Sequence, residues 1–280
     1  MTASVVLVTD STAYLPAEVA AANDIQVVPV QVVIGGVTYE EGVDITPGGV
    51  AAALKAYTPV STSRPTPQRF MDIYRAAAEA GAIAVVSAHL SADMSGTGES
   101  AILAAREAPI PVTVVDSRSI GMGLGFAVLS GAKAAREGAD AASVAEVVQR
   151  RAVAASAFFY VDTLEYLRRG GRIRAAQALV GSALMVKPLL SLVDGRVAPL
   201  ERVRTSARAL ARLEELAVAK ALEGACDIAV HHLDASARAE ALASRLRERL
   251  PDADIVISEV GAVVGAHVGP GMVAVVVAPR

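Results

Sequence analysis

Hydroxyl side chains and a glycine follow one buried strand of this chain, at the point where a helix is expected to begin. An apolar run over 82–88 predicts the strand, Ser95, Gly96 and Thr97 form the polar turn, and an Ala-rich stretch predicts the helix. The first amides of a helix lack intrahelical partners, and the helix dipole makes that end positive. This pattern therefore favours an anion, with Ser95 as an additional hydroxyl donor beside the amides.

Three further turns carry hydroxyl groups, and two of them also follow predicted strands. Residues 10–12 follow the strand over 4–8, residues 116–119 follow the strand over 112–116, and residues 61–66 precede the helix expected from Pro67. Each turn alone indicates no more than an ordinary turn or helix cap. Ligands of open parallel sheets bind beyond the carboxyl ends of the strands. Four such turns at one sheet edge therefore predict the polar floor of an anion-tolerant pocket.

The composition favours a compact α/β protein and disfavours several other classes. The 280 residues suffice for one large domain or two smaller ones, and a net charge of −3 with 4% aromatic residues argues against a nucleic-acid partner. Cys226 is the only cysteine, which indicates a cytoplasmic protein without disulfides. The scattered histidines predict no metal site. The sequence also predicts no signal peptide and no integral membrane segment, since no apolar run approaches about 20 residues.

Short β-branched runs alternate with Ala-rich stretches, as in parallel strands joined by crossover helices. The expected strands are 4–8, 25–33, 82–88, 112–116, 158–161, 185–193, 227–232, 254–259 and 272–278. The expected helices are 16–22, 47–56, 67–80, 97–107, 119–137, 141–154, a short Arg-rich piece after 161, 205–222 and 235–249. Asp194-Gly195 predicts a hairpin. We expect two α/β domains, 1–157 with a mostly parallel sheet and 158–280 with a mixed sheet.

Several motifs point to chemistry only weakly. The glycines at 121, 123 and 125 do not complete a dinucleotide-binding loop, because Phe126 stands where its third glycine is needed. Residues 162–173 indicate a helix stopped by glycine with a solvated basic end. Arg202 and Arg204, on an expected strand, indicate equally a surface face or a source of positive potential for the anion. His267 lies in an expected Gly-rich loop, where a lone histidine is usually only a hydrogen-bonding residue.

The motifs taken together resemble the DegV family, which includes the fatty-acid-binding subunits of bacterial fatty acid kinase. In chain order they include Val8-Thr9-Asp10-Ser11-Thr12, Gly42-Val43-Asp44-Ile45, Thr62-Ser63-Arg64-Pro65, Ser95-Gly96-Thr97, Asp116-Ser117, Val161-Asp162-Thr163-Leu164-Glu165-Tyr166-Leu167, Gly170-Gly171-Arg172-Ile173, Lys187-Pro188 and His267-Val268-Gly269-Pro270-Gly271. Each motif is weak alone, but they span essentially the whole chain. The resemblance implies the two-domain DegV-like (EDD) α/β fold, with a three-layer N-terminal domain and a C-terminal domain containing a mixed sheet.

The resemblance also implies a function. A non-catalytic protein of this kind encloses one long-chain fatty acid, such as palmitate, in a tunnel between or within its domains, and needs no cofactor. Thr62 and Ser95 would then hold the carboxylate, with Arg204 and His267 near the head group. In kinase-associated members a separate ATP-using partner phosphorylates that carboxylate. Candidate tunnel-lining residues are Met94, Ile120, Met122, Leu184, Met185 and Leu189, although ordinary core packing explains most such positions.

The chain departs from the family pattern near the head group. Arg64 stands where relatives often have glutamine, Thr66 where serine is common, and Gly98 where an aromatic residue is frequent. These departures bear on chain-length preference and on the partner.

Two other functions remain open. A hydrolase or acyltransferase would use Ser95 as nucleophile and His267 as base, oriented by a third group such as Asp116. The missing G-x-S-x-G elbow argues against it. The other alternative is a sensor or regulatory module for a small carboxylic acid.

Overall fold

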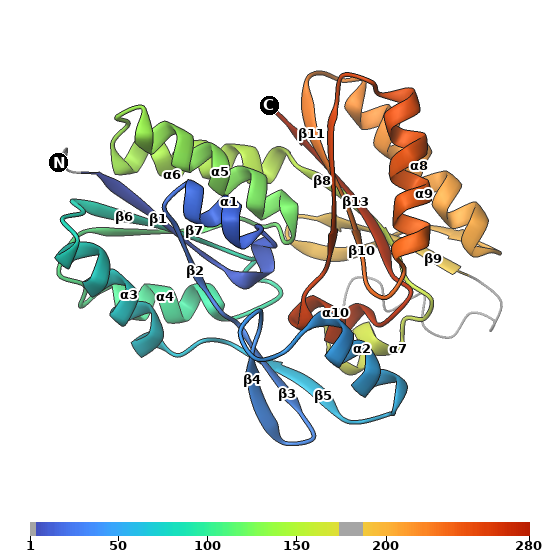
Figure 1. Ribbon diagram of the computed structural model, residues 1–280, viewed down its shortest axis with the longest axis horizontal. Coiled ribbons are helices and arrows are strands. Elements are labelled where there is room, and N and C mark those ends of the chain that lie inside the picture. The colour runs from blue at the N-terminus through green and yellow to red at the C-terminus, as the bar shows by residue number, and fades with distance from the viewer. Residues whose placement is uncertain (1–3, 174–186) are drawn as a thin grey trace. The chain divides into compact units, whose positions relative to one another are not determined.

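The computed structural model describes residues 4–173 and 187–280, and its contacts divide the chain into two compact units (Figure 1). The first unit takes Met1–Gln31 and Ser63–Ala154, and the second takes Val32–Thr62 and Ala155–Arg280. The chain therefore leaves the first unit, returns to it, and leaves it again. The sequence predicts a single boundary at residue 158, so that each domain is one uninterrupted stretch of chain. By their contacts, residues 32–62 group with the C-terminal part of the chain.

The first unit has three layers around a parallel sheet. The sheet runs in the order β2-β1-β6-β7, with α3 and α4 on one face and α5 and α6 on the other (Figure 1). The strands are β1 Val5–Asp10, β2 Ile25–Val28, β6 Ala84–His89 and β7 Val112–Asp116; the helices are the 3-10 turn η1 Ser11–Ala13, α1 Ala17–Ala22, α3 Pro67–Glu79, α4 Thr97–Ala105, α5 Met122–Arg136 and α6 Ala141–Ala154. The expected three-layer domain with a mostly parallel sheet is confirmed.

Both faces of this parallel sheet are buried. Leu7 and Val86 pack with α5 and α6, whereas Val8 and Val85 pack with Phe70 and Tyr74 of α3. Strands buried on both faces carry continuous apolar runs rather than alternating ones. The sequence of β6 has this pattern, and all six of its residues are buried.

The single strand expected over 25–33 is wrong. Those residues form β2 and a separate strand, β3 Gln31–Ile34, which belongs to a small sheet in the order β4-β3-β5. Pro29 lies between the two strands and cannot donate to a ladder, which favours a break at that point. The partners of β3 are β4 Val37–Glu40 and β5 Val60–Ser63, which the sequence analysis did not predict.

The second unit contains a mixed sheet in the order β10-β9-β8-β13-β11-β12, as expected. The strands are β8 Ser156–Tyr160, β9 Lys187–Val193, β10 Arg196–Val203, β11 Cys226–His232, β12 Asp254–Glu259 and β13 Val273–Pro279; the helices are α2 Pro47–Lys55, α7 Glu165–Arg169, α8 Ser206–Ala221, α9 Ser236–Arg249 and α10 Ala262–Val268. α8 and α9 bury their apolar faces in one core against the sheet. Residues 185 and 186 of the strand expected over 185–193 lie outside the described residues.

The hairpin predicted at Asp194-Gly195 is confirmed. β9 and β10 pair antiparallel with Val193 opposite Arg196, and the two turn residues have φ values of 50° and 77°. Positive φ at both central positions is the requirement of the tight hairpin turn whose twist matches that of the strands.

The expected loop around His267 is wrong, because residues 262–268 form α10 and His267 lies in its last turn. The helix ends at Gly269, whose φ of 75° stops it. Across residues 4–173 and 187–280, the helices include none with the length and apolar character needed to span a bilayer.

Acid should destabilise the second unit through His231. This residue of β11 is 3% exposed, and burial, the largest cause, lowers its pKa from 6.5 to about 4. Between these pH values the unfolded state binds a proton that the folded state does not, so the free energy of unfolding falls as the pH decreases. We expect His231 to account for a loss of up to about 3 kcal/mol from pH 6.5 to pH 4, in addition to any loss through His267, and for none above that window. Urea unfolding at pH 7.5, 5.5 and 4.5 measures it. An equally steep loss in His231→Gln would contradict this assignment.

Candidate functional site

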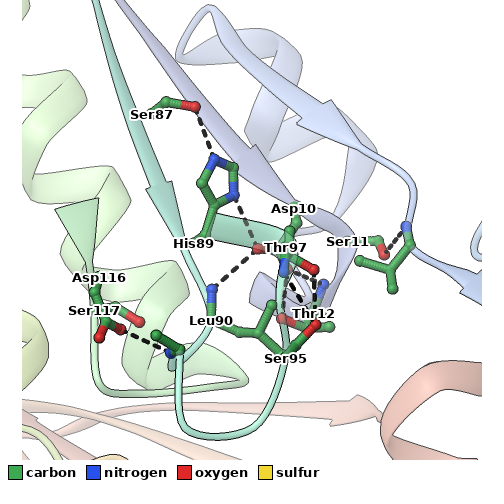
Figure 2. Close-up of polar contacts among 12 residues, drawn as sticks. Asp10, Ser11, Thr12, Ser87, His89, Leu90, Ser95, Thr97, Asp116 and Ser117 are labelled. Atoms are coloured by element: carbon green, nitrogen blue, oxygen red, sulfur yellow. Dashed lines mark hydrogen bonds and ion pairs between the residues drawn. The ribbon is translucent and has the colours of Figure 1, made fainter. Parts of the chain in front are cut away.

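Three of the four predicted polar turns meet at the carboxyl edge of the parallel sheet. β1, β6 and β7 run parallel as neighbours, so the residues that follow them emerge at the same edge (Figure 2). In the fourth expected turn, residues 60–63 form β5 of the small sheet. The hydroxyl of Thr62 is therefore carried by a strand and not by a turn.

Ser95 lies immediately before α4, as the sequence predicts. Its Oγ accepts a hydrogen bond from the Thr97 amide at 3.3 Å and lies 2.9 Å from Thr97 Oγ1. The N-cap residue is Gly96, which has no side chain to cap the helix, and Ser95 takes over part of that task. Because the Ser95 oxygen already accepts from an amide, its own proton can be donated to Thr97 or to an anion.

Arg64 contacts the same turn. Its Nη1 donates to Glu99 Oε2 at 2.5 Å and to the Gly96 carbonyl oxygen at 3.4 Å. Arg64 and Glu99 are both exposed, so solvent screens this ion pair and it contributes little to stability. The Arg64 guanidinium is thus paired with a carboxylate at the start of α4, next to Ser95.

A buried network under this edge was missed by the sequence analysis. One oxygen of the Asp10 carboxylate accepts from the Thr12 amide at 3.1 Å and from the Thr12 hydroxyl at 2.5 Å. The other oxygen accepts from the Leu90 amide at 3.0 Å and lies 3.0 Å from His89 Nδ1 (Figure 2). Asp10, Thr12 and His89 are fully buried. One carboxylate thus ties together the segments that follow β1 and β6.

The network continues from His89 into the core. His89 Nε2 lies 2.7 Å from Ser87 Oγ, which accepts from the Tyr74 hydroxyl at 2.8 Å. Burial, the largest cause, raises the pKa of Tyr74 to about 12, so this phenol stays protonated. Asp10, His89 and Ser87 have the chemical order of an acyl-transfer triad, but all three are 0% exposed and Ser87 cannot meet a substrate. Their arrangement is that of a structural network.

A signal for this pair was present in the sequence. Asp10 and His89 each end an apolar run, and β1 pairs with β6 so that Val8 is opposite Ser87. Two positions further along both strands, Asp10 and His89 are neighbours. The sequence shows both residue types at strand ends, but only the register between the strands puts them in contact.

The second unit pairs Thr62 with His267. Thr62 Oγ1 of β5 lies 2.9 Å from His267 Nε2 of α10, and 205 positions separate the two residues in the sequence. Burial, the largest cause, and the positive charge of Arg172 together lower the pKa of His267 from 6.5 to about 4. The imidazole is therefore neutral at neutral pH. His267 Nδ1 is buried and has no hydrogen-bond partner among the described residues.

The other two predicted head-group residues, Ser95 and Arg204, have no hydrogen bond to this pair in the described part of the chain. Ser95 belongs to the first unit. Arg204 belongs to the second unit, where it is exposed and lies in the link between β10 and α8. Within the described parts of the second unit, no hydrogen bond or ion pair joins Arg204 to Thr62 or His267. Of the four predicted head-group residues, the structure thus brings Thr62 and His267 into contact. The roles of Ser95 and Arg204 stay predictions.

The predicted tunnel-lining residues are buried or partly buried where the structure describes them. Met122 and Leu189 are buried, and Met94 and Ile120 are partly buried. Leu184 and Met185 lie outside the described residues. The tunnel itself stays a prediction.

The alternative hydrolase needs a carboxylate that orients His267. Asp116, its candidate, instead holds a turn in the first unit, where its Oδ1 accepts from the Ala92 amide at 3.1 Å and from the Arg118 amide at 3.0 Å. For metal chemistry, the chain over 4–173 and 187–280 offers no cluster of three or more His, Cys, Asp or Glu side chains suited to an ion.

The fold and these contacts define an α/β protein of two units, with hydroxyl groups at the carboxyl edge of a parallel sheet and a Thr–His pair in a mixed-sheet unit. The family model described as "Uncharacterised protein, DegV family" matches residues 4–280. The DegV domain-containing protein SCO2569 of Streptomyces coelicolor is 55% identical over 281 residues, which cover 100% of both chains. The chain belongs to the DegV family.

Two solved structures of this family are similar along the whole chain. A DegV family protein from Thermus thermophilus, described by its fatty acid binding, has a TM-score of 0.91 at 33% identity and covers 99% of this chain and 100% of its own. DegV from Bacillus subtilis, described as a fatty acid binding protein, has a TM-score of 0.92 at 30% identity, with 100% of both chains covered. These relatives confirm the DegV-like fold expected from the sequence.

Proposed function

We propose that this protein binds one long-chain fatty acid, such as palmitate, in a buried tunnel, with Thr62 and Ser95 as hydroxyl donors to its carboxylate. It acts as a non-catalytic carrier in cytoplasmic lipid transport or fatty acid metabolism and needs no cofactor. The observation that carries the proposal is the likeness, over the whole chain, to DegV structures described as fatty acid binding.

The chemistry of the two hydroxyl groups supports this head-group assignment. The Ser95 oxygen accepts from the Thr97 amide, and Thr62 adjoins a neutral imidazole, so both hydroxyls can donate to an anion. Hydroxyl and amide donors compensate the desolvation of a carboxylate without a fixed countercharge. The assigned roles of Arg204 and His267 near the head group belong to the same proposal.

The acyl tail would supply most of the binding free energy. Each buried methylene contributes about 0.8 kcal/mol, so a C16 chain supplies roughly 10 kcal/mol before entropic costs. The site then needs only to compensate the desolvation of the carboxylate, and it need not contribute further binding free energy at the head group. It also leaves the carboxylate chemically unaltered, which suits presentation to a separate ATP-dependent kinase as the partner of such a carrier.

Native mass spectrometry of the purified protein, followed by denaturation and lipid extraction, tests the proposal. We expect a mass excess of one fatty acid that is released unchanged on denaturation, because a carrier holds its ligand without a covalent bond. A protein at its bare mass that also takes up no added palmitate or oleate would rule out the fatty acid carrier.

Lipid extraction and an esterase assay separate the alternatives. A sensor of small carboxylic acids would release a small acid and no fatty acid. A hydrolase would turn over acyl esters and lose that turnover entirely in Ser95→Ala, whereas a carrier with this substitution keeps a weakly bound, non-covalent lipid. Ser244→Ala is the matched control, since Ser244 is an exposed residue of α9 in the second unit.

A further inference from the structure

The segment 162–170, which contains α7, packs closely against residues 267–271 at and after the end of α10. Three glycines in these two segments each approach a side chain of the other segment so closely that a methyl group built on them would overlap it. Gly170 adjoins the His267 imidazole, Gly269 adjoins the Tyr166 ring, and Gly271 adjoins the Asp162 carboxylate. For residues 162–173 the sequence predicts a helix stopped by glycine. The structure shows in addition that Gly170 packs against His267.

Gly170 is not required by its backbone conformation. Its φ of −73° and ψ of −9° are ordinary helical values that any residue adopts, whereas the next residue, Gly171, has a φ of 72° and ends the helix. What distinguishes position 170 is space, because the nearest atom to a built side chain is His267 Nδ1, followed by Cε1 and Cγ of the same ring. The absence of a side chain at 170 thus leaves room for the imidazole.

Arg172 is close enough to this ring for its positive charge to act on the imidazole. Its Nη1 donates to the Gly170 carbonyl oxygen at 2.5 Å, and half-burial lowers the pKa of the guanidinium without neutralising it. The guanidinium is therefore fixed on the residue that adjoins the imidazole, and its charge disfavours a protonated ring. A proton on Nδ1 would be buried without an acceptor among the described residues, whereas a proton on Nε2 has the Thr62 hydroxyl as its acceptor.

From this geometry we infer that Gly170 and Arg172 are positioning residues that hold His267 as the tautomer with the proton on Nε2. In that tautomer Nε2 donates to Thr62 Oγ1, and the Thr62 proton is left to donate to a hydrogen-bond acceptor. The inference deepens the proposed function and rests on it for the identity of that acceptor, the carboxylate of a fatty acid.

A double-mutant cycle on palmitate affinity tests the inference. Gly170→Ala should displace the ring and weaken palmitate binding about tenfold, the cost of one misaligned hydrogen bond. The matched control is Gly224→Ala in the second unit, because a methyl group built on Gly224 meets no described atom within 4 Å and its φ is not positive. In a His267→Ala background the ring is gone, so adding Gly170→Ala should change the affinity by less than about twofold.

The ¹⁵N spectrum of the imidazole rings gives a second readout that a merely structural role would not move. In the wild-type protein we expect a protonated Nε2 and an unprotonated Nδ1 for His267, assigned by comparison with His267→Ala. Gly170→Ala should alter this signature, and Gly224→Ala should leave it unchanged.

Three outcomes would overturn the inference. These are a protonated Nδ1 in the wild type, equal palmitate affinities for Gly170→Ala and Gly224→Ala, and a tenfold loss from Gly170→Ala that persists without the His267 ring. The wild-type spectrum decides the tautomer even where Gly170→Ala does not fold. A wild-type protein that shows the Nε2 tautomer but binds no palmitate would refute the proposed function and not the ring geometry.

Discussion

Asp10→Ala should lower the free energy of unfolding of the first unit by about 3–5 kcal/mol, the effect of breaking a fully buried charged network. The carboxylate accepts from the amides of Thr12 and Leu90 and from the Thr12 hydroxyl, and it contacts His89. Its removal leaves these polar groups buried without an acceptor. Urea unfolding followed by circular dichroism measures the loss.

Two further variants make this prediction specific. Asp10→Asn keeps the shape and one acceptor oxygen, so it should lose less than Asp10→Ala. Asp252→Ala removes an exposed carboxylate from a turn of the second unit and should change stability by less than about 0.5 kcal/mol. An Asp10→Ala protein as stable as the Asp252→Ala protein would show that the network contributes nothing to stability.

The double variant Thr62→Val/Ser95→Ala should show the largest loss of palmitate affinity. Each hydrogen bond to a charged group contributes about 1.5–3 kcal/mol, so each single substitution should weaken binding roughly 10- to 100-fold and the double variant more than either. Valine has nearly the shape of threonine, so the change removes a hydroxyl and little packing. Titration with a fluorescent fatty acid displaced by palmitate gives the dissociation constants.

Matched substitutions at exposed sites control for this experiment. Thr113→Val changes an exposed threonine of β7, and Ser244→Ala changes an exposed serine of α9. Both should bind palmitate as the wild type does. If the double variant bound palmitate within twofold of the wild-type affinity, the assignment of Thr62 and Ser95 to the head-group site would be wrong. A fatty acid found by mass spectrometry would still identify the class of ligand.

Local sequence patterns predicted most helices and strands because each depends on nearby residues. The polar turn before α4, the hairpin at Asp194-Gly195 and the parallel strand β6 all follow from apolar periodicity and turn chemistry. The same reasoning failed for residues 25–33 and for His267. In the first case Pro29 separates strands of two sheets, and in the second a short helix without a polar cap resembles a Gly-rich loop.

The sequence by itself determined the family, the α/β class and the candidate hydroxyl groups, because these depend on residue types in chain order. Only the tertiary structure decided which of those residues touch. Strand register brings His89 to Asp10, and long-range packing brings His267 to Thr62 across 205 positions and to the space left by Gly170. Such contacts arise from the packing of distant elements into shared cores, and that packing is not encoded in any local run of residues.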